Sequence, residues 1–326
     1  MPGGRLPCQR RTLRVVGLTC LGATIAVVFA LSISLGRTEK QSYSSLKLVS
    51  IIFRHGDRTP TDTYPEDPYN DDKYWPEGWG ALTNKGKMEM FTLGKFLRQR
   101  YNGFLSETYY PQEVHVRSSD NDRCLMSAES CLAGLYPPKG DQVWNPELLW
   151  QPIPVHATPR NLDAEKRKLQ LPAWTAGYYP DKLRTLAARS LALFSESQTM
   201  KRLNGGPLVK HIIEKMRSQS NTSRTVSPKF LMFSAHDVTI VNVLQTMGFT
   251  ELLKPQYGAA VIIELHSTND SGYEVKVLYL NNASDSEPHV LNTPGCTDKC
   301  HLQQFVDLMK PVLPDDWTVE CQKLDS

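Results

Sequence analysis

One short stretch of the chain places several chemically capable side chains next to one another: residues 54–60 read Arg-His-Gly-Asp-Arg-Thr-Pro. It follows the apolar run Leu46–Phe53, which has the composition of a buried strand. The imidazole of His55 is a competent nucleophile. The guanidinium groups of Arg54 and Arg58 offer paired N–H donors that match phosphate oxygens, and their charge keeps the imidazole neutral. These residues predict a phosphate site in which His55 attacks phosphorus.

The alternative is a strand end that carries a surface histidine and two solvated arginines, which is the usual explanation of a lone His. Five specified positions in the pattern R-H-G-x-R-x-P are too many to be expected by chance in a chain of 326 residues. We therefore favour the phosphate site, with Gly56 allowing a close approach of the backbone.

A second stretch supplies groups that a histidine-based phosphoryl transfer still needs. The apolar strand pattern Lys229–Phe233 is followed by Ser-Ala-His-Asp at residues 234–237. His236 can donate a hydrogen bond to a phosphoryl oxygen, and Asp237 can hold the proton that a departing alkoxide needs. The alternative for Asp237 is a simple cap of the helix predicted over residues 238–247.

A third arginine follows another predicted strand. The strand pattern of Glu113–Val116 ends in Arg117-Ser118-Ser119-Asp120. An arginine after a strand is usually solvated, so this signal is weak alone. Because the carboxyl ends of parallel strands meet at one edge of a sheet, we expect Arg117 to lie close to His55.

The remaining pattern predicts the elements that position these groups. Helical spacing of apolar residues recurs after each strand pattern, which favours an α/β domain with a three-layer sheet covered on both faces. The predicted helices are Thr83–Tyr101, Asp122–Leu135, Pro180–Phe194 and Gly206–Met216, and a late hairpin is predicted from Ala259–Leu265 and Tyr273–Leu280.

These motifs resemble those of the histidine acid phosphatases, the branch that contains the lysosomal, prostatic and testicular enzymes. The resemblance covers Leu46–Pro159 and Leu171–Cys321. It implies a three-layer α/β/α domain like that of the phosphoglycerate mutases, with a helical cap domain. The stretches that carry the resemblance are Trp75–Thr83, Val116–Arg123, Trp150–His156 and Ser234–Asp237.

The resemblance implies a two-step hydrolysis of orthophosphoric monoesters at acidic pH, without a metal or another cofactor. His55 would form a phosphohistidine and Asp237 would protonate the leaving group. The phosphoryl oxygens would be bound by Arg54, Arg58, Arg117 and His236. The alternatives are a phytase, a lysophosphatidic acid phosphatase-like relative, or a membrane-tethered short isoform with weak or no catalysis.

Composition limits the partners. A net charge of +3 is too small and dispersed to indicate nucleic-acid binding, and 40% hydrophobic residues is ordinary for a globular chain. The sequence has no Walker loop, dinucleotide glycine fingerprint or convincing metal-ligand cluster. We expect a small phosphate monoester as the ligand. Since members of the family often dimerise, the resemblance also implies a homodimer.

The N-terminal part predicts the compartment. Four arginines within residues 5–14 precede an uncharged stretch, Val15–Gly36, which as a helix would be about 33 Å long and could span a bilayer. Its length exceeds the usual signal core of about 7–15 residues, which favours a membrane anchor over a cleaved signal peptide. Residues 1–40 are thus a cytoplasmic tail with an anchor or signal, and residues 41–326 a catalytic domain in the secretory pathway. That domain would be lumenal or extracellular, or lysosomal or secreted after cleavage.

Glycosylation sequons fit this compartment, although such triplets also arise by chance. They begin at Asn221, Asn269 and Asn282. The resemblance implies a disulfide between Cys296 and Cys300, against the alternative of half a zinc site. Cys124 and Cys131 are seven residues apart on one predicted helix, about 10 Å along its axis, which is too far for a disulfide.

The chain departs from the family between Pro159 and Leu171, where the family has a sizeable, mostly helical insertion and this chain has only Arg160–Gln170. The cap domain is therefore expected to be truncated around residues 160–170. The resemblance implies that Cys321 has lost its usual disulfide partner. A genuine short-form enzyme and a poorly folding splice product both fit this departure.

Overall fold

The computed structural model describes residues 43–64, 66–158, 181–221 and 228–322. The predicted anchor Val15–Gly36 and the truncated insertion lie outside these residues. Within the described residues, no helix combines the length and the apolar character needed to cross a bilayer. The chain divides into two units, Met1–Ser44 and Ser45–Ser326.

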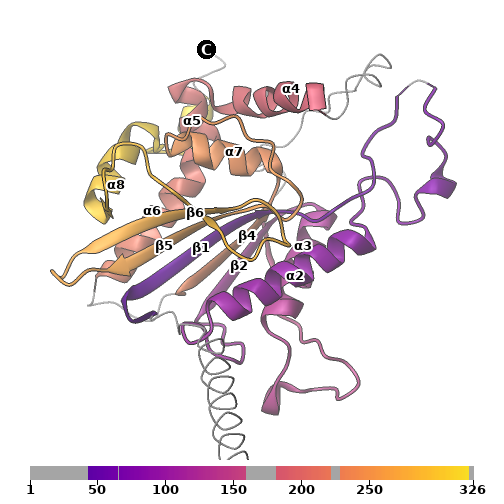
Figure 1. The fold of residues 1–326 in the computed structure, drawn as a ribbon, viewed down its shortest axis with the longest axis horizontal. Helices are drawn as coiled ribbons and strands as arrows, with labels where there is room; N and C mark the ends of the chain where they lie inside the picture. Colours follow the sequence, from indigo (N-terminus) through magenta and orange to yellow (C-terminus); the bar gives the residue numbers. More distant parts are fainter. Residues whose placement is uncertain (1–42, 65, 159–180, 222–227, 323–326) are drawn as a thin grey trace, which may run out of the picture. The chain divides into compact units, whose positions relative to one another are not determined.

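The second unit is built on a mixed sheet, which Figure 1 shows between two layers of helices. Among the described residues the strand order is β3-β2-β4-β1-β5-β6-β7, and β8 pairs with β6. The strands are β1 Leu46–Arg54, β2 Val114–Ser119, β3 His156–Thr158, β4 Phe230–Ala235, β5 Ala260–Ser267, β6 Tyr273–Leu280, β7 His289–Leu291 and β8 Cys300–His301. β1, β4, β2 and β3 run parallel, whereas β5 to β8 pair antiparallel.

Helices cover both faces of this sheet. The α-helices are α2 Asn84–Arg100, α3 Asp122–Leu135, α4 Asp181–Ala192, α5 Gln198–Asn204, α6 Gly206–Ser220, α7 Asp237–Thr246, α8 Leu302–Met309 and α9 Trp317–Gln322. Short 3₁₀ turns occur at η1 Tyr43–Ser45, η2 Asp72–Tyr74, η3 Gly140–Gln142, η6 Leu193–Ser195 and η7 Lys310–Val312. In Figure 1, α2 and α3 lie on one face and α6, α7 and α8 on the other, so the three-layer prediction is confirmed.

Successive side chains of a strand point to opposite faces of the sheet, which gives the domain a buried core on each face. Side chains on one face of β1, β4 and β5, such as Ile52, Phe233 and Val261, pack with α6, α7 and α8 in one buried apolar cluster. The opposite face meets α2 and α3, where the ring of Tyr101 lies edge-on to Phe230 at 5.5 Å. Apolar side chains therefore cover both faces of the sheet, and this packing holds in place the strand ends that carry the site.

α2 and α3 pack closely because glycine lies at their contact. A Cβ atom on Gly94 would lie 1.9 Å from the carbonyl oxygen of Cys131, and one on Gly134 would lie 2.2 Å from that of Phe91. The backbones thus touch at positions that no other residue type fits. This contact fixes α3, whose first turn enters the site described below.

Several predicted bounds are confirmed. Thr83 caps α2 by accepting a hydrogen bond from the Gly86 amide, and α3 and β6 have the predicted ranges. Cys296 and Cys300 form a disulfide with Cα atoms 5.2 Å apart. β2 differs from its prediction, because it continues to Ser119 rather than ending at Val116.

Candidate active site

The Arg-His-Gly turn leaves β1 and packs directly against the start of α2. A Cβ on Gly56 would lie 2.3 Å from the carbonyl oxygen of Gly86, so the two backbones meet only because both residues lack side chains. Thr83 ties the turn down further, since its amide donates to the Asp57 carbonyl at 3.0 Å and its hydroxyl to the Asp57 carboxylate at 2.8 Å. The turn that carries His55 is therefore held rigidly.

The ring of His55 is fixed in one tautomer. His55 is 3% exposed, and its Nδ1 lies 2.8 Å from the carbonyl oxygen of Gly56. A carbonyl oxygen only accepts hydrogen bonds, so Nδ1 carries the ring proton and Nε2 carries a lone pair. Nε2 accepts a hydrogen bond from Arg123 Nε at 3.1 Å. The nitrogen with the lone pair thus faces a guanidinium group.

Burial lowers the pKa of His55 well below its ordinary value, and the positive charge of Arg54 lowers it further. His236 and Arg123 act in the same direction, whereas the hydrogen bond to Gly56 raises the pKa. The imidazole therefore stays neutral in acidic solution, where an ordinary histidine is protonated. A neutral ring is what nucleophilic attack requires.

Arg54 ends β1 and is held on several sides. Its Nη1 donates to the carbonyl of Pro255 at 2.8 Å, and its Nη2 pairs with the Asp237 carboxylate at 3.1 Å. The guanidinium carbon lies 4.0 Å above the ring of Tyr257, a cation–π contact. Its Nε is buried and has no hydrogen-bond partner among the described residues. A donor is therefore left over for a ligand.

Arg58 and Arg123 complete the cationic part of the site. Arg58 donates from Nη1 to the Thr59 carbonyl at 2.9 Å, and its buried Nε lacks a partner among the described residues. Burial lowers its pKa, and the charges of Arg123 and Arg54 add to that effect. Arg123 lies in the first turn of α3 and also donates to Asn121 at 3.0 Å. Three guanidinium groups from two distant segments therefore converge around His55.

Asp237 begins α7 and supplies the carboxylate. Its Oδ2 contacts Arg54 Nη2 at 3.1 Å and Lys254 Nζ at 3.3 Å. Burial raises the pKa of Asp237, but the charges of Arg54 and Lys254 outweigh it and bring the pKa to about 2. Asp237 is thus ionised in the ligand-free site in mildly acidic solution as well as at neutral pH.

His236, which caps α7, lies beside His55. It is 2% exposed, and its ring is edge-on to that of His55 with centroids 5.5 Å apart. Its Nε2 lies 3.0 Å from the Ser119 hydroxyl and 3.5 Å from Cys124 Sγ. The predicted juxtaposition of the histidine turn with the Ser-Ala-His-Asp stretch is therefore present.

The structure does not bring Arg117 into this cluster. Because β2 extends to Ser119, Arg117 lies within the strand, paired with Phe233 and His156. It lines a separate cavity on the α6 side, with His211. The chain leaves the sheet only after Ser119, and the residue delivered to His55 is Arg123. The placement of Arg117 at the phosphate site is corrected accordingly.

Sequence reasoning missed three contributors. Arg123 was part of the Val116–Arg123 motif, and its signal was a position in the first helical turn after a strand. Lys254 and Tyr257 come from the irregular segment between α7 and β5, where no periodic pattern marks a function.

Within the described residues, no group of three or more His, Cys, Asp or Glu side chains is arranged to hold a metal ion.

The unsatisfied donors of the cluster indicate what it can bind. Arg54 and Lys254 share the carboxylate of Asp237, and the buried Nε atoms of Arg54 and Arg58 have no hydrogen-bond partner among the described residues. Buried guanidinium donors of this kind are costly unless an acceptor joins them. The site is therefore built for an oxyanion in front of His55 Nε2.

Comparison with known proteins agrees with this geometry. The family model described as histidine phosphatase superfamily (branch 2) matches residues 45–172 and 181–280. The human lysosomal acid phosphatase is 35% identical, covering 85% of this chain and 80% of that protein. The rat prostatic acid phosphatase is 33% identical, covering 95% and 97%. The first alignment spans 344 positions, more than the 326 residues of this chain, so the human relative contains residues that this chain lacks.

Solved structures show the same fold. The apo form of the Hafnia alvei phytase superposes with a TM-score of 0.60 at 19% identity, covering 83% of this chain and 97% of that one. The Citrobacter braakii phytase gives 0.52 at 16% identity, covering 85% and 99%. At these identities the likeness concerns the fold alone.

Proposed function

Since the chain belongs to branch 2 of the histidine phosphatase superfamily, we propose that it is an acid phosphatase that hydrolyses phosphate monoesters through a phosphohistidine on His55. The observation that carries this proposal is the His55 ring. Its Nδ1 proton is held by the Gly56 carbonyl and its Nε2 lone pair faces Arg123. The guanidinium groups of Arg54, Arg58 and Arg123 surround the same space.

In the first step, the substrate phosphoryl group replaces the ring as the partner of Arg123. His55 Nε2 forms a bond to phosphorus while the bond from phosphorus to the ester oxygen breaks. The guanidinium groups stabilise the charge on the phosphoryl oxygens in the transition state. His236 donates a further hydrogen bond to one oxygen, and Asp237 gives a proton to the departing alkoxide.

The proton on Asp237 comes from the substrate. A phosphate monoester has its second pKa at about 6, so in acidic solution its phosphoryl group enters the site with one proton. Once Arg54 engages the phosphoryl oxygens, it stabilises the Asp237 carboxylate less, and the carboxylate can take that proton. Acidic pH therefore favours the protonated substrate, while burial keeps His55 neutral.

In the second step, water attacks the phosphohistidine on the side of Asp237. The carboxylate of Asp237 removes a proton from the water as the new P–O bond forms. The N–P bond breaks and its electron pair returns to His55 Nε2. Inorganic phosphate leaves, and Arg123 regains its hydrogen bond to the ring.

The same proposal extends to compartment and modification. The names of the relatives support a lysosomal or secreted setting. Asn221 and Asn269 are exposed, as glycosylation requires, while Asn282 donates to Asp285 at 2.7 Å and would have to release it. Membrane anchoring through Val15–Gly36 and dimerisation stay predictions from the sequence.

The test is turnover of a chromogenic phosphate monoester at about pH 5 by the purified chain. His55→Ala should lower kcat by roughly a thousandfold or more, because the covalent step is lost. His289→Ala, at an exposed histidine, is the matched control and should leave kcat unchanged. Equal activity of His55→Ala and the wild type would refute the assignment of the nucleophile. An inactive wild type that is folded would favour the tethered, non-catalytic alternative.

A further inference from the structure

A cavity lies on the α6 side of the sheet, and its described lining includes Ser119, which contacts His236, but neither His55 nor Arg54, Arg58 or Arg123. Its volume is about 360 Å³, within the range of small-molecule sites. The floor comes from β2 and β4 and the walls from α5, α6, α7 and α9. The apolar part of the lining is formed mainly by Phe194, Leu203, Leu208, Phe233, Val238 and Trp317.

The described residues that line this cavity carry charge of one sign. Among the described residues that line it, Arg117 is the cation, and none is an aspartate or glutamate. The described part of the chain gives the Arg117 guanidinium no ion pair with an acidic side chain. A half-buried guanidinium without an acidic partner is more stable with an anion beside it.

His211, from α6, provides a second polar group. Its Nε2 is buried and has no hydrogen-bond partner among the described residues. Burial lowers the pKa of His211 to about 4, and the nearby charges of Arg117 and Lys215 act in the same direction. The ring is therefore neutral above that pH, with an unsatisfied nitrogen beside the guanidinium. An unsatisfied buried polar atom of this kind indicates a missing partner.

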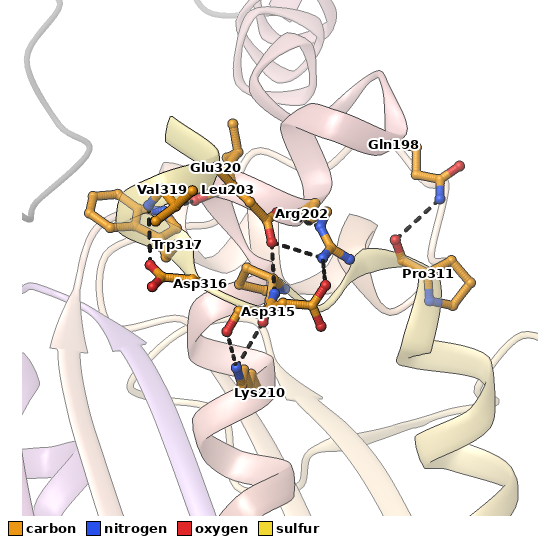
Figure 2. A network of polar contacts seen from close by, with 11 residues as sticks. Gln198, Arg202, Leu203, Lys210, Pro311, Asp315, Asp316, Trp317, Val319 and Glu320 are labelled. Carbon is orange, nitrogen blue, oxygen red and sulfur yellow. Dashed lines mark hydrogen bonds and ion pairs between the residues drawn. The ribbon is translucent and has the colours of Figure 1, made fainter. Parts of the chain in front are cut away.

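The wall opposite the sheet is held in place by the C-terminal segment. Figure 2 shows Arg202 joined to Glu320 and Asp315, and Lys210 joined to the backbone that precedes α9. Trp317, at the start of α9, donates from its indole to the Leu203 carbonyl at 2.9 Å. Trp317 and Leu203 both line the cavity. Its apolar wall is therefore preformed rather than assembled by a ligand.

We propose that this cavity is a binding site for an amphiphilic anion, an unbranched acid of medium chain length. The acidic head would accept hydrogen bonds from Arg117 and from His211 in its Nε2–H form. The apolar tail would lie against Leu203, Leu208 and Trp317. Inorganic phosphate, which has no apolar tail, fits the His55 cluster better, because that cluster has three guanidinium groups.

The test is calorimetric titration of the whole chain with decanoate at about pH 6, in the presence of saturating inorganic phosphate to occupy the His55 cluster. We expect saturable binding, a similar affinity for decyl sulfonate, and at least tenfold weaker binding of decanol and of acetate. A similar affinity for the two anions would show that the site recognises the negative charge of the head group rather than the carboxylate itself. Saturable binding of decanol with the same affinity as decanoate would overturn the proposal.

Variants locate the site. Arg117→Gln should weaken decanoate binding by roughly tenfold or more. Arg217→Gln, which removes a cation from the exposed side of α6, is the matched control and should not weaken it. Leu208→Trp, which fills the cavity, should abolish binding even if Arg117→Gln does not fold. Arg123→Gln, in the His55 cluster, should leave decanoate affinity unchanged. Loss of affinity in Arg123→Gln but not in Arg117→Gln, or retention in Leu208→Trp, would overturn the proposal. These outcomes are independent of whether His55→Ala abolishes turnover.

Discussion

At the scale of the residue, the site depends on one hydrogen-bonded ring, that of His55. A histidine that works as a nucleophile in acid has to be neutral where a free imidazole is charged. The structure achieves this by burying His55, surrounding it with Arg54 and Arg123, and using the Gly56 carbonyl to fix the proton on Nδ1. The reactive nitrogen and the charge that will bind the phosphoryl group are thus set by the same contacts.

The first prediction separates two arginines that the sequence could not. Arg123→Gln should lower kcat/KM by roughly a hundredfold to a thousandfold, because one donor to the transition-state oxygens is lost. Arg117→Gln should cause a loss at least tenfold smaller, since Arg117 lies in the other cavity. Steady-state kinetics on a chromogenic monoester measure both. The reverse ranking would return the phosphate-binding role to Arg117.

At the scale of the element, strands and helices were largely predictable, because the helices bury one apolar face and the central strands β1 and β4 are apolar over most of their length, and both patterns are local. The cap at Thr83 and the whole of α3 and β6 follow from such patterns. The end of β2 was misplaced because Ser118 and Ser119 are polar. Ser118 is buried and pairs with Ser234 of β4, and Ser119 pairs with Thr158 of β3, which are contacts that no local pattern reveals.

The candidate site was predictable to the extent that its residues follow strands. Arg54, His55, His236 and Asp237 meet because β1 and β4 are parallel neighbours. The segment between α7 and β5 has no period, yet it brings Pro255, Tyr257 and Lys254 to Arg54 and Asp237. Such contacts depend on the path of an irregular loop, and so they were absent from the sequence-based prediction.

This loop gives the second prediction. The ammonium group of Lys254 favours the ionised form of Asp237, so Lys254→Met should raise the pKa of that carboxyl from about 2. The protonated acid then persists to higher pH, and the upper limb of the kcat profile should move up by roughly half a unit to one unit. Lys254→Arg keeps the charge and is the control. A profile that moves down, or moves equally in Lys254→Arg, would contradict this role.

At the scale of the whole molecule, operation in acid has a cost in stability. The pKa of His211 is about 4 and that of His55 lies well below its ordinary value, whereas both are near 6.5 in the unfolded chain. Between these values the unfolded chain binds more protons than the folded one. The free energy of unfolding should therefore fall as the pH drops from 6.5 toward 4.

The third prediction follows from this expected fall in the free energy of unfolding with decreasing pH. His211→Gln should flatten the decline of the free energy of unfolding between pH 6.5 and 4, because one of the titrating groups is removed. Urea denaturation at a series of pH values measures it, with the exposed His289→Gln as the control. Asp237 adds to the decline only at the acidic end of this window, since its carboxyl has a pKa of about 2 in the folded chain but is partly protonated near pH 4 in the unfolded chain, and this contribution is the same in both variants. A steeper decline in His211→Gln would mean that protonation of His211 stabilises the folded chain, which would contradict this prediction.

The most direct measurement of the central claim is acid-sensitive trapping of the phosphoenzyme. The chain is mixed with a labelled phosphate monoester at about pH 5 and quenched in alkali, and the labelled peptide is mapped and its phosphohistidine isomer determined by ³¹P NMR. We predict an alkali-stable, acid-labile phosphohistidine at His55, attached through Nε2, and no label in His55→Ala. Label on another residue, or on Nδ1 of His55, would contradict the account, because the Gly56 carbonyl holds the proton on that nitrogen.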